Sequence, residues 1–483
     1  MKIVKSAHVG ALGGLGRGRT PEWIIASLLI LLEVSLIVLS LSLYKGLTKN
    51  SRTIVGGVAG LLGVLLPALY LARLYIKSVA AERRLFSMVV GMNLVTVCVV
   101  GLAGEVVVRV SATPNDQGVE VFGTTLLPKD WQAVTVWNRR LLKEVPQSIS
   151  YLTADNLLGW TIAPNRVSKN GLYTSSQEGI RSPTVGMSYR EPSQPNRMAI
   201  VGDSFTFALG VPFQSSWGAQ LEDRLADKVE VLNFGVDAYG IDQAYLRYHR
   251  DVKPLRPNIV MLGFIEHDLF RTMNVYPFIG HPAFWQRPFA KPRFAILHEK
   301  LELLNSPLIT PSDLFALPTV TSLPFIEYEP GYAAEEWQWR WYHHSALVRY
   351  VVSRFPRWPD PSSLVSEAAT AAIDVEILLR FVREVEAEGA IPLLVYLPGR
   401  GDFIGWERRG RDFVFQSLQG KHVPYVDLGP CMKQGETSML FLEGDPHYSP
   451  EGNARLADCL TPIVQERLGS RGAGARARLE QGL

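Results

Sequence analysis

The sequence predicts an α/β domain in which a mainly parallel sheet lies between two layers of helices, preceded by a membrane-spanning segment. Two observations support this fold class. Strand-like and helix-like patterns alternate after residue 198, which is typical of parallel sheets covered on both faces. Hydrophobic residues make up 47% of the 483-residue chain, and their longest runs lie before residue 110. A chain of this length is long enough for two or more structural units.

Three apolar runs near the N-terminus are each long enough to cross a bilayer, which takes about 20 residues. They run from Trp23 to Tyr44, from Ile54 to Leu74 and from Met88 to Val108. The first run is too long for a simple signal peptide and lacks a small-residue cleavage site. We therefore expect residues 1–110 to be a membrane anchor with three transmembrane helices.

Basic residues around these runs predict the orientation of the anchor, because Lys and Arg concentrate on the cytoplasmic side. Four precede the first run and four lie between the second and third: Lys2, Lys5, Arg17, Arg19, Arg73, Lys77, Arg83 and Arg84. The remaining loop carries only Lys45, Lys49 and Arg52. This pattern favours a multi-pass inner-membrane protein with a cytoplasmic N-terminus, and everything after Val110 in the periplasm.

Two carboxylates fall within the predicted spans. Glu33 lies inside the first span, where it either makes a protonated contact between helices or marks a membrane protein partner; both interpretations stay open. Glu105 lies near the end of the third span, and we expect it to reach the membrane interface.

Residues 111–197 predict a connector and the N-terminal segment of the exported part, and residues 111–150 are expected to be mixed and partly helical. A short amphipathic helix is expected from Trp131 to Leu142, near the membrane. The stretches Asp155 to Asn165 and Glu178 to Arg181 are rich in Gly, Pro or Asn, which favour turns. We expect Trp160 to pack against the next domain.

The α/β domain is predicted over residues 198–468, and its first strand ends at Gly202-Asp203-Ser204. Later strands are expected at Val229–Phe234, Asn258–Phe264, Ile391–Leu397 and Val423–Leu428. Helices are expected at Trp217–Ala226, Ile241–Asp251, Ala371–Glu388, Phe413–Gln419 and Pro450–Leu468. Pro462 should kink or split the last helix. Right-handed crossovers bring the carboxyl ends of parallel strands to one edge, so Ser204, Gly235 and the turn Glu266–Asp268 should meet there.

Two segments of this region depart from the alternating pattern. Residues 272–364 are rich in Pro and aromatic residues and predict an insertion whose aromatic side chains either pack in a core or face a ligand. Within it, His343 and His344 are expected to be structural or exposed, as is His249 on its helix. Residues 469–483, with glycines and several arginines, predict a disordered tail.

A hydroxyl, an imidazole and a carboxylate form the candidate catalytic group. Serine alone is a poor nucleophile and needs a base. His447 and Asp445, two residues apart, could supply the base and the group that orients it. We expect Asp203 to bond nearby backbone without taking a chemical step. Cys431 and Cys459 flank this loop and could form a disulfide in an oxidising compartment.

Composition argues against several other classes of function. The net charge of +3 gives no strong electrostatic footprint for nucleic acid, so we expect no nucleic-acid partner. The three cysteines, Cys98, Cys431 and Cys459, form no CxxC or Cys/His cluster. We therefore expect no metal site and no cofactor.

Taken together, the motifs resemble the SGNH or GDSL hydrolases over roughly residues 198–465, with a gap at the insertion. Gly202-Asp203-Ser204 is similar to the first family motif, with Phe205 in place of leucine. Asn233-Phe234-Gly235 is similar to the second, and Asp445-Pro446-His447 to the last. The resemblance implies a flavodoxin-like three-layer sheet, with Ser204 as nucleophile, His447 as general base and Asp445 as its orienting group. The upstream stretch from Asp155 to Asn165, with Gly179 and Arg181, also resembles a segment of membrane-anchored bacterial members.

The third motif departs from the family pattern, because His267 stands where the family has an asparagine donor. The backbone N–H groups of Ser204 and Gly235 are the other candidates for an oxyanion hole. A neutral imidazole can donate through one ring nitrogen, so His267 could take the place of the asparagine.

These expectations lead to three functional hypotheses. The first is a membrane-anchored serine esterase or O-acyl (acetyl) transferase acting outside the cytoplasm on exported or cell-surface polysaccharide. Its partners would be an acylated carbohydrate or other ester, the lipid bilayer and, for transfer, a membrane protein. The alternative is a non-catalytic polysaccharide-binding or assembly subunit that keeps the hydrolase fold; the departure at His267 favours it. A membrane scaffold alone ranks third.

Overall fold

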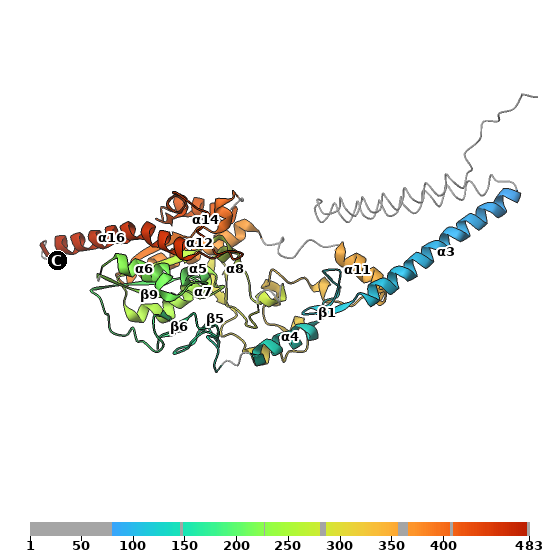
Figure 1. The fold of residues 1–483 in the computed structure, drawn as a ribbon, viewed down its shortest axis with the longest axis horizontal. Coiled ribbons are helices and arrows are strands. Elements are labelled where there is room, and N and C mark those ends of the chain that lie inside the picture. The colour runs from blue at the N-terminus through green and yellow to red at the C-terminus, as the bar shows by residue number, and fades with distance from the viewer. Residues whose placement is uncertain are drawn as a thin grey trace, which may run out of the picture. The chain divides into compact units, whose positions relative to one another are not determined.

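The computed structural model describes residues 80–144, 148–226, 228–280, 286–355, 366–405 and 409–480 (Figure 1). The chain divides into two compact units. The first contains Met1–Thr113, Val121–Leu127 and Arg340–Pro359. The second contains Pro114–Glu120, Pro128–Trp339 and Asp360–Leu483.

The first unit contains the long helix α3, Ala80–Val110. Its part Val90–Val110 is long and apolar enough to cross a membrane, and it is the one such segment among the residues described. It corresponds to the third predicted span, Met88 to Val108. The other two predicted spans, with Glu33, lie outside the described residues, so the three-helix anchor stays a prediction.

The first unit also contains a short helix that packs against α3, with a strand and a 3₁₀ turn packed against that helix. It contains strand β3 (Thr124–Thr125), a 3₁₀ turn η9 (Trp341–His344) and helix α11 (Ala346–Arg354). Glu105 of α3 accepts hydrogen bonds from the backbone N–H groups of Ala346 and Leu347. Its carboxylate therefore caps the N-terminus of α11.

A seven-stranded sheet forms the centre of the second unit, in the order β14-β13-β10-β8-β9-β7-β6. Five strands are parallel neighbours: β8 (Asn196–Val201), β9 (Val229–Asn233), β10 (Ile259–Phe264), β13 (Ile391–Tyr396) and β14 (Val426–Asp427). In chain order their arrangement is 2-1-3-4-5, the doubly wound order of flavodoxin-like sheets. The predicted parallel sheet is confirmed for these five strands.

Two further strands extend one edge of this sheet and run antiparallel. They are β6 (Thr174–Ser175) and β7 (Arg181–Ser182), which come from the predicted connector. The connector also forms the hairpin β4 (Leu152–Asp155) and β5 (Gly159–Ile162) and the helix α4 (Trp131–Glu144). The turn-forming residues of this region correctly predicted breaks in regular structure. They did not indicate the short strands β4 to β7 between those breaks.

Alternate residues of β8 pack into different helical layers, which explains why the whole strand is apolar. Met198 and Ile200 pack with α6 (Trp217–Arg224) and α16 (Pro450–Glu480). Ala199 and Val201 pack with α7 (Ile241–Arg247), α12 (Glu367–Ala387) and α14 (Arg409–Gly420). The sheet is thus the middle of three layers, as predicted.

Two predicted helices differ from those in the structure. The helix expected over Ile241–Asp251 is α7 followed by a π-helical turn, Tyr248–Val252. The last helix is not split at Pro462 and continues to Glu480. Residues 469–480, which we expected in an unstructured tail, are therefore helical.

The aromatic insertion is mostly a packed region of the second unit. It contains the hairpin β11 (Arg293–Leu297) and β12 (Lys300–Leu304), helix α10 (Pro311–Leu314) and several 3₁₀ turns. Phe289 and Phe294 are buried in the main core. Tyr276, Phe278 and Phe315 pack in a smaller cluster with Trp131 of α4. The core interpretation therefore holds for these side chains, whereas Trp339 and Trp341 are exposed.

Gly202, at the end of β8, has no room for a side chain. A Cβ there would lie 2.2 Å from Thr206 Oγ1 and 2.4 Å from the carbonyl oxygen of Gly263. We expect Gly202→Ala to lower the free energy of unfolding by about 1–3 kcal/mol, because neighbouring backbone must move. Gly420→Ala, at a position with nothing within 4 Å, is the matched control and should leave the thermal unfolding midpoint unchanged. Equal midpoints for the two variants would contradict this expectation.

Candidate active site

Ser204 stands at the carboxyl end of a central strand, as the first residue of the short helix α5, Ser204–Phe207. Asp203 caps this helix: its Oδ1 accepts hydrogen bonds from the N–H groups of Phe205 and Thr206. Because β8 and β10 flank the point where the strand order reverses, Ser204 occupies the usual ligand position of a doubly wound sheet. The Ser204 side chain is only 2% exposed.

The structure brings Ser204, His447 and Asp445 together from positions 243 residues apart. His447 Nε2 lies 2.8 Å from Ser204 Oγ. On the other side of the ring, Nδ1 lies 2.5 Å from Asp445 Oδ1. The three side chains form a continuous line in which the imidazole can take the hydroxyl proton while the carboxylate fixes the tautomer.

Asp445 is held in its ionised form. Burial raises the pKa of this carboxyl. Hydrogen bonds from the backbone and ring of His447, together with the nearby charge of Arg400, lower the pKa by more than burial raises it, so the net pKa is below the usual range. An ionised partner stabilises the imidazolium that forms when the ring accepts a proton.

Several contacts fix the loop that carries the imidazole. The Phe205 ring packs on the His447 ring, with 5.0 Å between centroids. Arg400 Nη2 donates to the carbonyl oxygens of Leu442 and Asp445, at 2.7 and 3.0 Å. These contacts hold both the ring and its backbone in place.

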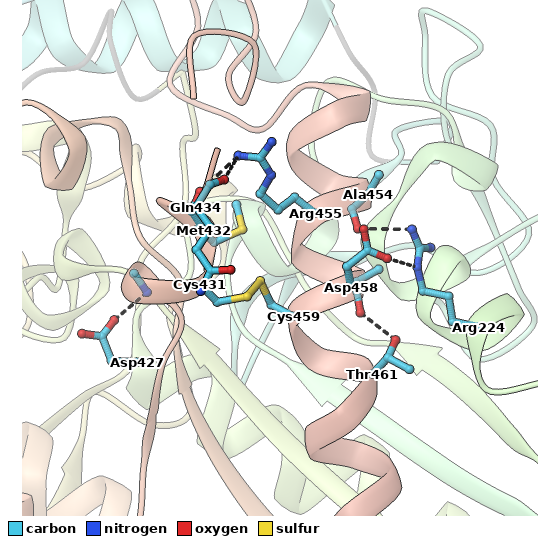
Figure 2. Close-up of a disulfide and its surroundings, with 12 residues drawn as sticks. Arg224, Asp427, Cys431, Met432, Gln434, Ala454, Arg455, Asp458, Cys459 and Thr461 are labelled. Carbon is cyan, nitrogen blue, oxygen red and sulfur yellow. Dashed lines mark hydrogen bonds and ion pairs between the residues drawn. A yellow bond between two sulfur atoms is a disulfide. The ribbon is translucent and has the colours of Figure 1, made fainter. Parts of the chain in front are cut away.

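A disulfide closes the same loop (Figure 2). It joins Cys431 of the short helix α15 (Gly429–Met432) to Cys459 of α16, 28 residues apart in sequence. Figure 2 shows Arg455, one turn earlier in α16, reaching back to the start of the loop, where it donates to the carbonyl oxygens of Met432 and Gln434. Asp445 and His447 lie inside this closed loop.

The three predicted oxyanion donors are placed differently. Ser204 is the first residue of α5, so its N–H has no acceptor within the helix. The N–H of Gly235 already donates to Asn233 Oδ1 at 2.9 Å, and a Cβ at Gly235 would lie 2.3 Å from the Phe207 nitrogen. His267 is the second residue of α8 (Glu266–Arg271), and its side chain is exposed.

A buried charge cluster links the ends of β8 and β10. Arg271 Nη1 lies 2.7 Å from Asp268 Oδ1 and 3.3 Å from Asp203 Oδ2. Burial and the negative charge of Asp203 raise the pKa of Asp268 well above its usual value, although Arg271 opposes this. The third motif had pointed to the region of Asp268, but no sequence pattern indicated that Arg271 bridges the two carboxylates.

Arg181, which the resemblance singled out, holds the backbone that follows the nucleophile. Its guanidinium donates to the carbonyl oxygens of Phe207, Ala208 and Val211 and lies 4.6 Å from the centroid of the Phe207 ring. Gly179 has a positive φ of 68°, and a Cβ there would meet the carbonyl oxygen of Ile162 at 2.6 Å. The upstream segment therefore supports the nucleophile turn.

A pocket of about 600 Å³ lies beside the nucleophile turn, between the β4–β5 hairpin region and the end of α5. Tyr151, Tyr173 and Phe207 contribute its aromatic walls, and Lys169 and Asp237 add charged groups. Burial raises the pKa of Tyr173, and the charges of Asp237 and Asp445 raise it further. Phe207 belongs to the same short helix α5 as Ser204, which places one wall of the pocket beside the nucleophile turn. Within the described ranges, no three His, Cys, Asp or Glu side chains are grouped to hold a metal ion.

The doubly wound sheet, with Ser204 at the carboxyl end of β8 and within hydrogen-bonding distance of His447 from the loop before α16, defines the class: a three-layer α/β domain of the hydrolase type. A model of the GDSL-like lipase/acylhydrolase family matches residues 198–350. The chain thus contains a domain of this family, which comprises ester-hydrolysing enzymes. The matched range includes Ser204, Gly235 and His267 but ends before Asp445 and His447.

Solved structures of similar proteins each cover 56% of this chain. One is TesA, 14% identical, with 98% of that chain covered and a TM-score of 0.31. A lipase/acylhydrolase from Enterococcus faecalis is 13% identical, with 96% covered and a TM-score of 0.31. The acetylxylan esterase Axe2 from Geobacillus stearothermophilus is 13% identical, with 93% covered and a TM-score of 0.29. No curated protein matches the chain.

If Asp445 orients His447, Asp445→Asn should lower kcat for p-nitrophenyl acetate by roughly 10³–10⁴-fold, because an amide favours the wrong imidazole tautomer. Glu443→Gln removes an exposed carboxylate from the same loop and should change kcat little. A loss in Asp445→Asn no larger than that in Glu443→Gln would show that Asp445 does not orient the base.

The disulfide should stabilise the folded protein by closing a loop. We expect Cys431→Ala/Cys459→Ala to lower the free energy of unfolding by roughly 3–4 kcal/mol, the loop-entropy value for a separation of 28 residues. Chemical denaturation under non-reducing conditions measures this change, and Cys98→Ser, which removes the free thiol, is the control. Mass spectrometry that finds Cys431 and Cys459 as free thiols in the wild-type protein would contradict the assignment.

Proposed function

We propose that this protein is a membrane-anchored serine ester hydrolase or O-acyl (acetyl) transferase that acts outside the cytoplasm on exported or cell-surface polysaccharide. The observation that carries the proposal is the hydrogen-bonded line from Ser204 through His447 to Asp445. A buried hydroxyl next to an oriented imidazole is the arrangement that acyl transfer through serine requires.

In the proposed mechanism, Ser204 Oγ attacks the carbonyl carbon of the ester while His447 Nε2 accepts the hydroxyl proton. Asp445 stabilises the imidazolium. The same proton then passes to the oxygen of the departing alcohol as the carbon–oxygen bond breaks, leaving an acyl-serine. Water or a sugar hydroxyl, deprotonated by His447, attacks the acyl-serine, so that the acceptor decides between hydrolysis and transfer.

The tetrahedral intermediate needs donors for its oxyanion. We assign this role to the N–H of Ser204, with Gly235 and His267 completing the hole. Gly235 would share its N–H with Asn233 Oδ1, and His267 would turn a ring nitrogen toward the oxyanion. One such donor contributes about 10²–10³-fold to kcat, so a weak donor set would lower the rate without abolishing it.

Two features of the chain support a site outside the cytoplasm. A disulfide forms and persists in oxidising compartments, and Cys431 and Cys459 are bonded. The apolar segment Val90–Val110 precedes the catalytic domain and could anchor it. The predicted multi-pass topology, with the N-terminus in the cytoplasm, is consistent with both features.

The pocket beside the nucleophile turn supports a carbohydrate substrate. Its walls combine the aromatic rings of Tyr151, Tyr173 and Phe207 with the polar groups of Lys169, Asn170 and Asp237. Ligand pockets typically pair such apolar surfaces with a few polar groups that fix orientation. The flat faces of sugar rings stack on aromatic side chains, while hydroxyl groups need polar partners.

One observation favours the alternative, a polysaccharide-binding or assembly subunit that keeps the fold without catalysis. The Gly235 N–H has an acceptor within the chain, and the third motif offers an exposed histidine in place of an amide. A binding subunit could keep the pocket while losing the oxyanion hole.

Hydrolysis of p-nitrophenyl acetate by the full-length protein in detergent separates the two hypotheses. Ser204→Ala should reduce kcat at least about 10³-fold, because no nucleophile remains. Ser438→Ala removes an exposed serine from the loop that carries the base and should keep the wild-type rate. Equal background rates for wild type and Ser204→Ala would support the binding subunit instead.

A further inference from the structure

A segment of the aromatic insertion, residues 340–355, is attached to the end of the apolar helix α3. Glu105 caps α11 through the N–H groups of Ala346 and Leu347, and it also accepts a hydrogen bond from Ser345 Oγ at 2.8 Å. Arg109 donates to the carbonyl oxygen of His344 at 3.0 Å. These contacts bridge about 240 residues of sequence and all lie within the last two turns of α3.

A second segment, residues 121–127, braces α11 on its other side. Arg349 Nε donates to the carbonyl oxygen of Leu127 at 2.7 Å, and the Leu127 N–H donates to Ser353 Oγ at 2.8 Å. The ring of Phe122 meets the ring of Tyr350 edge-on, with 6.0 Å between centroids. We call residues 121–127 and 340–355 together the collar.

The collar exposes apolar side chains even though its backbone is held in place. Trp341 is 83% exposed and Phe122 is 65% exposed. Val348, Val351 and Phe355 are also exposed and, at spacings of three and four residues, lie along one side of α11. Val107 and Val110, in the last turn of α3, are exposed as well, and α11 packs against α3.

The charges of the collar have one sign. It contains Arg340, Arg349 and Arg354 and neither Asp nor Glu. Arg109 adds a cation at the end of α3, and the carboxylate of Glu105 is used as the cap of α11. Exposed Trp and Phe side chains combined with basic residues are typical of segments at the boundary between hydrocarbon and headgroups.

We propose that the collar is a membrane-interfacial element that inserts Trp341 and the apolar side of α11 among anionic lipids at the outer end of α3. The proposal rests on the membrane anchoring proposed above. A lipid surface fits better than a protein partner, because α11 packs against a helix that already has the length and apolar character of a span. The arginines attract anionic headgroups. The collar thereby holds α3 at a fixed depth.

Site-directed spin labelling of the full-length protein in nanodiscs of phosphatidylcholine and phosphatidylglycerol tests the proposal. The native thiol of Cys98, in the middle of the candidate span, takes the first label, because the other two cysteines are bonded. The second label is placed at Val351→Cys in a Cys98→Ser background. Val185→Cys in the same background, an exposed valine of the second unit, is the matched control.

Accessibility to oxygen, which partitions into lipid, is compared with accessibility to a water-soluble nickel complex. For the Val351 label we expect the ratio of oxygen to nickel accessibility to be well above that of the Val185 label and below that of Cys98. Removing phosphatidylglycerol should reduce the ratio at Val351. No change on its removal would overturn the role of anionic lipid.

The outcomes separate this proposal from membrane anchoring itself. A Cys98 label that is accessible from water would overturn both the membrane anchoring and the collar proposal. A Cys98 label in lipid, with a Val351 label that matches Val185, would overturn the collar alone. A Val351 label shielded from both reagents would also overturn it and would indicate a protein partner on α11.

Discussion

The buried ion cluster of Asp203, Arg271 and Asp268 is the interaction on which the site depends. Strands β8 and β10 are hydrogen-bonded along their length, but the nucleophile turn and α8 begin where that ladder stops. A single arginine between two carboxylates ties these two ends together. Asp203 also caps α5. The same carboxylate therefore pairs with Arg271 and holds the first turn of the helix that carries Ser204. Removing one member of such a cluster leaves a buried charge without its partner.

The imidazole reaches this position from the far end of the chain through helix packing. Helix α16 packs against α6 on the face of the sheet that includes Met198 and Ile200, and Arg224 of α6 pairs with Asp458 of α16 (Figure 2). The disulfide joins the start of this loop to α16, and Arg400 holds the loop at Leu442 and Asp445, next to the imidazole. The position of His447 is therefore a result of the third layer of the fold as much as of its own loop.

Much of this arrangement could be predicted from sequence, because it depends on local patterns. Apolar runs separated by helices predicted the five parallel strands in their correct places, although the last of them, β14, has only two residues. The hydroxyl, imidazole and carboxylate could be named because each stands in a short motif at the end of such a strand or before a helix. Their roles in catalysis, and those of Gly235 and His267 as donors, stay predictions.

Features that depend on distant contacts could not be predicted. The two-residue strands β6 and β7 have no periodicity of their own and form because the edge of β9 is open to them. Arg271 carries no motif, and its role appears only when β8 and β10 are adjacent. Trp341 belongs by composition to the aromatic insertion, but in the structure it lies with α3, because Glu105 caps a helix some 240 residues further along the chain.

The wide separation between nucleophile and base has a consequence for biosynthesis. Chains grow from the N-terminus and domains generally fold as units, so the domain that begins at β8 is not complete until α16, which packs against one face of its sheet, has been made. Any product truncated before residue 447 would lack both the hydrogen bond from His447 to Ser204 and the helix α16 that covers one face of the sheet. A stop codon anywhere between positions 204 and 447 would thus have the same effect on this contact.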